Sequence, residues 1–252
     1  MASLLNLNYP PEMLVLIGLA FLGARTIKGI LGMGLPAILM VSLTLIMPPL
    51  EAIPLIFLPM LFINVVQFFR GPHPQKTARE YSVFAIAAFV VIIVVGLNLK
   101  RFPEEMLLAS IGVAMILFAI PSLYGWRYHI GPSRLWQLMA GVCTGIIGGL
   151  SSIWSPPVVM YLMGRNINKD EFVGVVGFLF MVGSLGLGIA LGTIKLLEAS
   201  LFVPSMVGLG IALIGFRLGE RIRARIDRDR FTKIIMLAFL LMGLRLVLIS
   251  TS

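Results

Sequence analysis

The chain has 252 residues, of which 59% are hydrophobic and only 12% charged, and its mean hydropathy is +1.01. A soluble domain carries about 25% charged residues, and apolar runs of about 18 or more residues recur here, so the composition excludes an ordinary soluble enzyme and predicts a polytopic membrane protein. The net charge of +9 comes largely from Lys and Arg in short loops between apolar runs, a pattern that indicates membrane orientation rather than nucleic-acid binding.

Eight apolar segments follow one another along the chain, and two of them are interrupted by glycine and proline. The first covers 13–47 with a break at 28–36 (KGILGMGLP), and the fifth covers 135–163 with a break at 148–157 (GGLSSIWSPP). The first is too long for a single span of about 20 residues, so we expect two half-helices of roughly 12 to 15 residues. The continuous segments cover 51–69, 82–99, 106–123, 172–192, 201–216 and 234–249.

A shift of 120 residues superimposes the two halves of the sequence. It pairs Gly29 with Gly149, Pro36 with Pro156, Met40 with Met160, and Glu51 with Glu171. The order of broken segment, loop, acidic helix start and further spans is also shared. This self-similarity predicts a first membrane repeat at 1–124 and a second at 125–252, within one integral membrane domain.

The distribution of basic residues among the loops distinguishes between two membrane topologies. If both broken segments dip into the membrane and return, the loops on one side hold most of the basic residues, and the other side holds Lys100, Arg101 and Lys195. If all eight segments cross, the basic residues divide more evenly. The positive-inside rule therefore favours an all-α protein of two inverted repeats, with both termini outside. Each repeat would be a re-entrant helix hairpin plus three transmembrane helices.

The two hairpin tips carry the candidate binding chemistry. The second half-helix of each hairpin would begin at the tip and offer free backbone N–H groups, which bind anions. Basic side chains precede the first tip, where snorkelling or pairing with a helix end is the alternative, and Ser and Trp donors surround the second, where helix packing is the alternative. The candidate anion-binding residues are Arg25, Lys28, Gly32, Gly34, Pro36, Asn64, Ser151, Ser152, Trp154, Ser155 and Pro156. Weaker candidates, for which packing is the first alternative, are Thr26, Gln67, Thr144 and Ser184.

The positions of the acidic residues also indicate which kind of substrate the protein can bind. All 11 Asp and Glu residues fall in loops or at segment ends, so cation coordination in the membrane is disfavoured and an anionic substrate is favoured. The sequence has no metal-ligand motif and no nucleophile–base pair, which predicts no metal, no cofactor and no enzyme. The GxxxG motifs at 188–192 and 215–219 can support a homodimer contact.

Two stretches of the sequence resemble a known family. GILGMGLPAIL followed by PPLEAIPLIFLPMLFIN is similar to the first half of the TauE/SafE sulfite exporter family, and GVCTGIIGGLSSIWSPPVVMYLMGRNINKDEFVGVVGFLF is similar to its second half. The resemblance covers nearly the whole chain in length, order and duplication. The sequence departs from the family pattern at Ser-Ser-Ile-Trp-Ser in the second tip and at Ile53 and Val173, where the family often has a Gly-Thr pair.

The resemblance implies a multi-pass transporter of the prokaryotic inner membrane that moves sulfite, sulfonates or related organosulfur anions, often outward. We expect a secondary transporter that works by alternating access, with the anion bound between the two tips. A passive anion channel and a membrane scaffold that moves nothing are the alternatives. The basic segment 217–233 would contact anionic membrane lipid or, in a scaffold, a protein partner.

Overall fold

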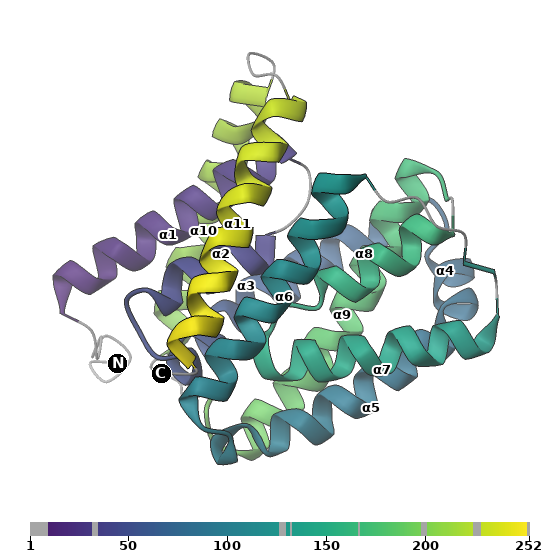
Figure 1. The fold of residues 1–252 in the computed structure, drawn as a ribbon, viewed down its shortest axis with the longest axis horizontal. Helices are drawn as coiled ribbons and strands as arrows, with labels where there is room; N and C mark the ends of the chain where they lie inside the picture. Colours follow the sequence, from purple (N-terminus) through teal and green to yellow (C-terminus); the bar gives the residue numbers. More distant parts are fainter. Residues whose placement is uncertain are drawn as a thin grey trace.

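In the computed structural model, helices joined by short turns and loops make up the residues that it describes, which are 10–31, 35–125, 130–131, 133–165, 167–197, 201–223 and 228–250 (Figure 1). The helices are α1 (Pro11–Leu31), α2 (Leu35–Thr44), α3 (Pro49–Phe69), α4 (Pro74–Glu80), α5 (Ser82–Leu97), α6 (Glu104–Tyr124), α7 (Arg134–Ser151), α8 (Ser155–Gly164), α9 (Lys169–Thr193), α10 (Phe202–Arg223) and α11 (Arg228–Ser250). A 3-10 helix, η2 (Leu99–Arg101), joins α5 to α6.

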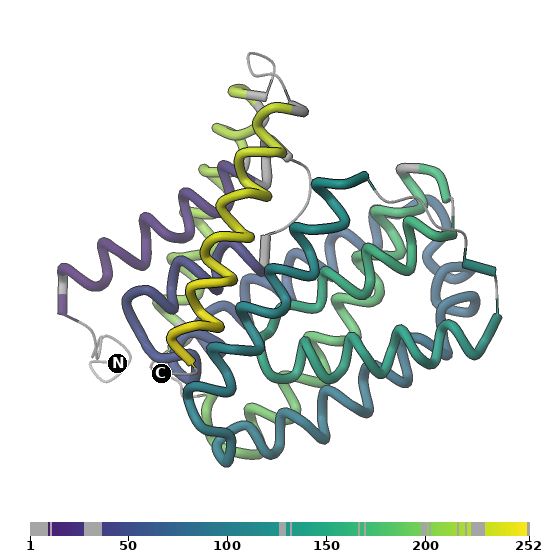
Figure 2. The backbone as a smooth tube through the Cα atoms, viewed as in Figure 1, coloured from purple at the N-terminus to yellow at the C-terminus, as the bar shows by residue number. Residues whose placement is uncertain are grey.

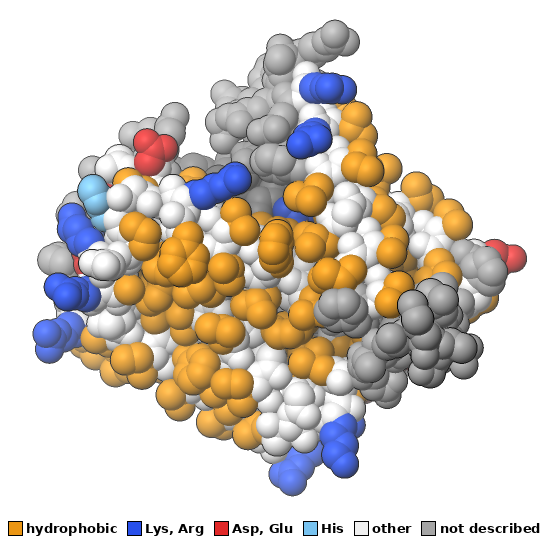
Figure 3. Space-filling model, turned by 180° about the vertical axis from the view of Figure 1, so that it is seen from behind, with side chains coloured by type: hydrophobic (Ala, Val, Ile, Leu, Met, Phe, Trp, Pro, Cys, Tyr) orange, Lys and Arg blue, Asp and Glu red, His pale blue; other side chains and the backbone are white. Residues whose placement is uncertain are grey.

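Four of these helices, α3, α6, α9 and α11, are long and apolar enough to cross a membrane. A fifth span is added if α4 and α5, which bend by 71° at their junction, are counted as one. Figure 3 shows hydrophobic side chains over the middle of one face, with Lys and Arg side chains at its margins. The predicted all-α membrane protein is thus confirmed, whereas the eight-segment inverted topology stays a prediction.

Both broken segments divide where glycine and proline predicted a break. α1 ends at Leu31 and α2 begins at Leu35, while α7 ends at Ser151 and α8 begins at Ser155. The halves are unequal, however, because α1 has 21 residues and α2 only 10. Proline at the first helical position lets α1 begin at Pro11, before the apolar run that defined the expected half-helix.

Two segments expected as loops are partly helical. A short helix, α4, lies within the basic stretch that follows α3. The basic stretch 217–233 is also largely helix, because α10 continues to Arg223 and α11 begins at Arg228. Arginine is a good helix former and needs no apolar partner, so a helix can extend beyond its apolar part.

The helices of the two halves pack in a matching pattern, which the tube in Figure 2 follows. α1 lies along α10, and α5 lies along α7 in the same way; α3 contacts α9, and α6 contacts α11. Glycine permits the closest approaches: a Cβ at Gly112 would stand 2.6 Å from the Gly243 carbonyl oxygen, and one at Gly243 would stand 2.8 Å from the Gly112 oxygen. The backbones of α6 and α11 therefore touch at these two residues.

The two GxxxG motifs contain glycines that are used inside the chain. A Cβ at Gly188 would stand 2.5 Å from the Phe57 ring, and one at Gly215 would stand 2.6 Å from the Leu22 carbonyl oxygen. Both glycines therefore serve packing between helices of one copy. The homodimer stays a prediction.

Candidate functional site

The turn between α7 and α8 is held by hydrogen bonds to its own backbone. The Ser151 hydroxyl donates to the Ile147 carbonyl oxygen at 2.6 Å and accepts from the Ile153 N–H at 3.0 Å. Ser152 has a φ of 57°, in the left-handed region, and its N–H donates to the Gly148 carbonyl oxygen at 2.9 Å. This left-handed residue stops α7 and turns the chain, so that α8 can start three residues later with proline in its first turn.

Three polar side chains at this turn are buried without a hydrogen bond. The Ser152 hydroxyl, the Trp154 indole N–H and the Ser155 hydroxyl are at most 2% exposed as residues, and none has a partner in the part of the chain that the structure describes. Buried polar groups in proteins are nearly always hydrogen-bonded, because an unmade bond costs about 1–3 kcal/mol. Three such groups lie together at one helix break, beside the N-terminus of α8.

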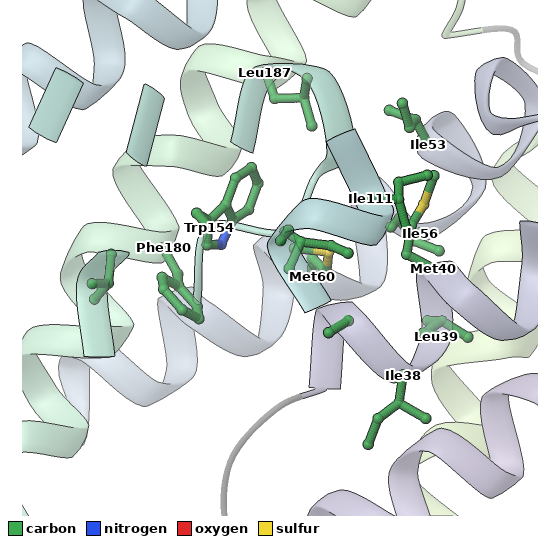
Figure 4. Close-up of a cluster of buried hydrophobic side chains, with 14 of the residues drawn as sticks. Ile38, Leu39, Met40, Ile53, Ile56, Met60, Ile111, Trp154, Phe180 and Leu187 are labelled. Carbon is green, nitrogen blue, oxygen red and sulfur yellow. The ribbon is translucent and has the colours of Figure 1, made fainter. Parts of the chain in front are cut away.

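Trp154 is fixed by its surroundings. A Cβ at Gly148 would stand 2.9 Å from the indole ring, and the ring of Phe180 lies edge-on with its centroid 6.0 Å away. Figure 4 shows Trp154 in one buried cluster with Met60 of α3 and Met40 of α2. The indole N–H therefore belongs to a side chain that is packed against apolar neighbours and the α7 backbone.

The first break is described only in part. Arg25, in α1, is 4% exposed, and its Nε–H has no hydrogen-bond partner among the described residues. Gly32 and Gly34 lie outside the described residues. Lys28 falls in the last turns of α1 and Pro36 in the first turn of α2, and the side chains of both also lie outside the described part. Arg25 is thus the cation near this tip whose burial the structure describes.

The remaining candidates bond to the protein itself. The Asn64 amide donates to the Ser184 hydroxyl at 3.4 Å, and the Gln67 amide donates to the Val173 carbonyl oxygen at 2.9 Å. The hydroxyls of Thr26 and Thr144 donate to carbonyl oxygens four residues earlier in their own helices, Leu22 and Ala140. Pro156 is buried in the first turn of α8. The structure thus joins Asn64 to α9 and brings Ser151, Ser152, Trp154, Ser155 and Pro156 together at one break.

A model of the family described as Sulfite exporter TauE/SafE matches residues 16–246, nearly the whole chain and both helix breaks. The chain belongs to the TauE/SafE sulfite exporter family. A membrane transporter of sulfite or organosulfur anions is what this family implies. Neither the curated proteins nor the solved structures contain a match to the chain.

This TauE/SafE chain also has a polar cluster that sequence reasoning missed. Arg165, which caps the end of α8, pairs with Glu80 at 3.0 Å, and the Gln137 amide donates to the Glu80 carbonyl oxygen at 3.0 Å. Tyr81 and Tyr161 lie beside this pair with their rings edge-on at 6.4 Å. No periodicity or repeat spacing relates residues so far apart in the chain, so sequence reasoning had no signal for this cluster.

The described residues also lack a cluster of side chains that could bind a metal ion together. No group of three or more His, Cys, Asp or Glu side chains comes together there. What the second break offers is neutral hydrogen-bond donors, with a buried guanidinium near the first. Such groups bind anions through their N–H and O–H hydrogens.

Proposed function

We propose that this TauE/SafE family member is a secondary transporter that exports a small sulfur-containing anion across the inner membrane of a prokaryote. The observation that carries the proposal is the set of three buried donors without partners at Ser152, Trp154 and Ser155. A sulfite or sulfonate group has three oxygens that accept hydrogen bonds, so it can satisfy these donors together. The family match supports the class of substrate.

In this proposal the positive charge comes from the first half of the chain. Arg25 is buried with an unused Nε–H, and Lys28 is assigned the same role from its position before the first break. The backbone N–H groups at the start of α2 and α8 add donors and a partial positive charge. The anion would thus lie between the two breaks, with neutral donors on one side and cationic donors on the other.

We further propose two inverted repeats at 1–124 and 125–252, with eight membrane segments. The matching pairs of helices support this architecture: α1 with α10 and α7 with α5 become equivalent when the halves are exchanged. In inverted repeats the binding site lies at their interface, and rocking of one repeat against the other exposes it alternately to the two sides. Export would follow from release on the outer side.

The test is flux of labelled sulfite in proteoliposomes, with taurine-like sulfonates, sulfate and acetate as competitors, with and without a pH gradient. We expect saturable uptake and counterflow, competition by sulfonates but not by acetate, and loss of affinity in Lys28→Ala. The matched control is Lys76→Ala, because Lys76 is an exposed residue of α4 and lies outside the proposed site. A stimulating pH gradient would identify the coupling ion.

The alternatives give different results in the same assay. Flux that does not saturate and shows no counterflow would identify a passive channel and overturn alternating access. Absence of any anion flux in folded protein would overturn transport and favour the scaffold. Flux of a sulfonate without sulfite would keep the mechanism and change the substrate.

A further inference from the structure

A surface pocket lies away from the two helix breaks, where three basic stretches of the chain meet. It has a volume of about 480 Å³ and opens between the α4–α5 junction, the start of α7 and the end of α8. Its lining residues are Arg79, Glu80, Ser82, Val83, Arg134, Gln137 and Arg165. None of these residues belongs to the candidate anion site, so the pocket is a separate feature of the protein.

The charge of the pocket is positive after its internal ion pair is counted. Arg165 and Glu80 pair with each other at 3.0 Å, which leaves the guanidinium groups of Arg79 and Arg134. Both of these residues are exposed, and neither side chain has a hydrogen bond or ion pair in the described part of the chain. Two guanidinium forks on a polar pocket are suited to a phosphate or another oxyanion, which they can bind bidentately.

The wall behind Arg165 carries two more unused donors. Tyr81 is 0% exposed and Tyr161 is 1% exposed. Neither hydroxyl has a hydrogen-bond partner among the described residues. Burial, and next the Glu80 carboxylate, raises the pKa of Tyr81 to about 12, so its hydroxyl keeps its proton at physiological pH. The Arg165 guanidinium is therefore flanked by the Glu80 carboxylate and by neutral tyrosine hydroxyls. The net positive charge of the pocket comes from Arg79 and Arg134.

The pocket borders an exposed apolar surface of α7. Directly after Arg134, α7 exposes Leu135, Trp136, Leu138 and Met139, which are between 46% and 63% exposed. Exposed apolar side chains on a membrane helix contact acyl chains, and tryptophan is enriched at the level of the headgroups. An anion in this pocket would thus have hydrocarbon on one side, as a lipid phosphate has and a dissolved ion lacks.

We propose that this pocket binds the phosphate group of an anionic membrane lipid through Arg79, Arg134 and Arg165, with the acyl chains along the exposed side of α7. The lipid would join α4, α7 and α8, which come from both halves of the chain. Basic pockets between membrane helices on the cytoplasmic side of a bilayer bind such headgroups. The proposal does not depend on which anion the protein transports.

The test uses delipidated protein in a neutral detergent and measures binding of fluorescent phosphatidylglycerol, with fluorescent phosphatidylcholine as the neutral reference. The test variant is Arg79→Gln/Arg134→Gln, whose side chains are exposed and have no partner to lose. The matched control is Arg70→Gln/Lys76→Gln, which removes the same charge from exposed residues of the same basic stretch without touching the pocket. Gel filtration and thermal unfolding establish that both variants are folded.

We expect phosphatidylglycerol to bind at least about tenfold more weakly to the test variant, which corresponds to about 1.4 kcal/mol, and unchanged in the control. Equal losses in the two variants would mean a diffuse charge effect and would overturn the pocket. Inorganic phosphate and sulfite are added separately in isothermal titrations. Binding of either ion that requires Arg79 and Arg134, without preference for phosphatidylglycerol, would assign the pocket to a dissolved oxyanion and overturn the lipid.

Discussion

The Asn64 amide donates a hydrogen bond to the Ser184 hydroxyl at 3.4 Å, and the two residues are 120 positions apart in the chain. The same shift superimposes the two halves of the sequence. Asn64 in α3 and Ser184 in α9 thus occupy equivalent positions and touch each other. Equivalent residues can meet only where two copies approach a common axis, so the crossing of α3 and α9 supports an axis between the halves.

Two further contacts between α3 and α9 are related to each other by the same shift of 120 residues. A Cβ at Gly188 would stand 2.5 Å from the ring of Phe57, and a Cβ at Gly177 would stand 2.6 Å from the backbone nitrogen of Phe68. The residue 120 positions after Phe57 is Gly177, and the residue 120 positions before Gly188 is Phe68. Each contact is therefore the counterpart of the other on the opposite side of the Asn64–Ser184 bond.

The two sides of that bond should respond differently to substitution. Ser184 also donates to the Phe180 carbonyl oxygen at 2.7 Å, so Asn64→Leu leaves the hydroxyl bonded. Ser184→Ala instead leaves the buried Asn64 amide without its acceptor. We expect the free energy of unfolding in mixed micelles to fall by about 1–3 kcal/mol for Ser184→Ala and by less than about 1 kcal/mol for Asn64→Leu.

Ser110→Ala is the control for this pair, because the Ser110 hydroxyl donates only within its own helix, to the Leu107 carbonyl oxygen at 2.7 Å. Its effect should be smaller than that of Ser184→Ala. Equal losses for Ser184→Ala and Asn64→Leu would show that the hydrogen bond between α3 and α9 contributes nothing specific.

Inverted repeats predict that equivalent surface positions lie on opposite sides of the membrane. His73 and Thr193 are one repeat apart, and both are exposed. The natural cysteine, Cys143, is exposed and is first replaced by serine. A membrane-impermeant maleimide should then label His73→Cys from one side of oriented vesicles and Thr193→Cys from the other. Labelling of both from the same side would rule out the inverted arrangement.

The position of Trp154 should depend on the absence of a side chain at Gly148. An added Cβ would meet the indole ring at 2.9 Å, so Gly148→Ala must displace Trp154 or the turn that carries it. We expect sulfite affinity in a binding assay to fall by about tenfold or more, which is about 1.4 kcal/mol. Gly192→Ala is the matched control, because a Cβ there meets nothing within 4 Å. Unchanged affinity in Gly148→Ala would separate Trp154 from the anion site.

Trp154→Phe removes the indole N–H and keeps an aromatic ring against Phe180. The smaller ring leaves a cavity, but removing a buried N–H without a partner offsets part of that cost, so the free energy of unfolding should fall by only about 1–2 kcal/mol while sulfite affinity falls by about tenfold. Isothermal titration and chemical unfolding of the same preparation measure both quantities. A variant that loses stability but binds sulfite normally would assign the indole to packing.

The sequence could predict the breaks and the repeat because their causes are local. Glycine weakens the interior of a helix, and proline is tolerated in its first turn but breaks its interior. The glycines and prolines of 28–36 and 148–157 accordingly mark the breaks before α2 and α8, which begin at Leu35 and Ser155. The start of α1 at Pro11 was missed because apolar length alone defined that segment. Ser152 was expected as a donor, whereas its left-handed φ of 57° depends on the turn formed by its neighbours.

The basic pocket could not be predicted, because its residues come from three stretches far apart in the chain. Arg79, Arg134 and Arg165 were interpreted only as loop charges that orient the protein in the membrane. Their meeting depends on how α4, α7 and α8 pack, and hydropathy and repeat spacing carry no information about that. The bond between Asn64 and Ser184 was hidden for the same reason, although the repeat shift alone relates the two positions.

Arg25 gives the sharpest test of the charge in the proposed site. It is 4% exposed with an unused Nε–H, and a buried cation that lacks its partner destabilises the fold until it meets an anion. Arg25→Met keeps an unbranched, flexible side chain and removes the charge. We therefore expect sulfite affinity to fall by about tenfold to a hundredfold, the loss of about 1.5–3 kcal/mol from one charged hydrogen bond, without a loss of stability. Arg101→Met, at an exposed residue bonded to Asn98, is the control and should bind sulfite normally. If Arg25→Met also binds sulfite like the unchanged protein, the charge in the site must come from Lys28, and Lys28→Ala in the same assay decides that point.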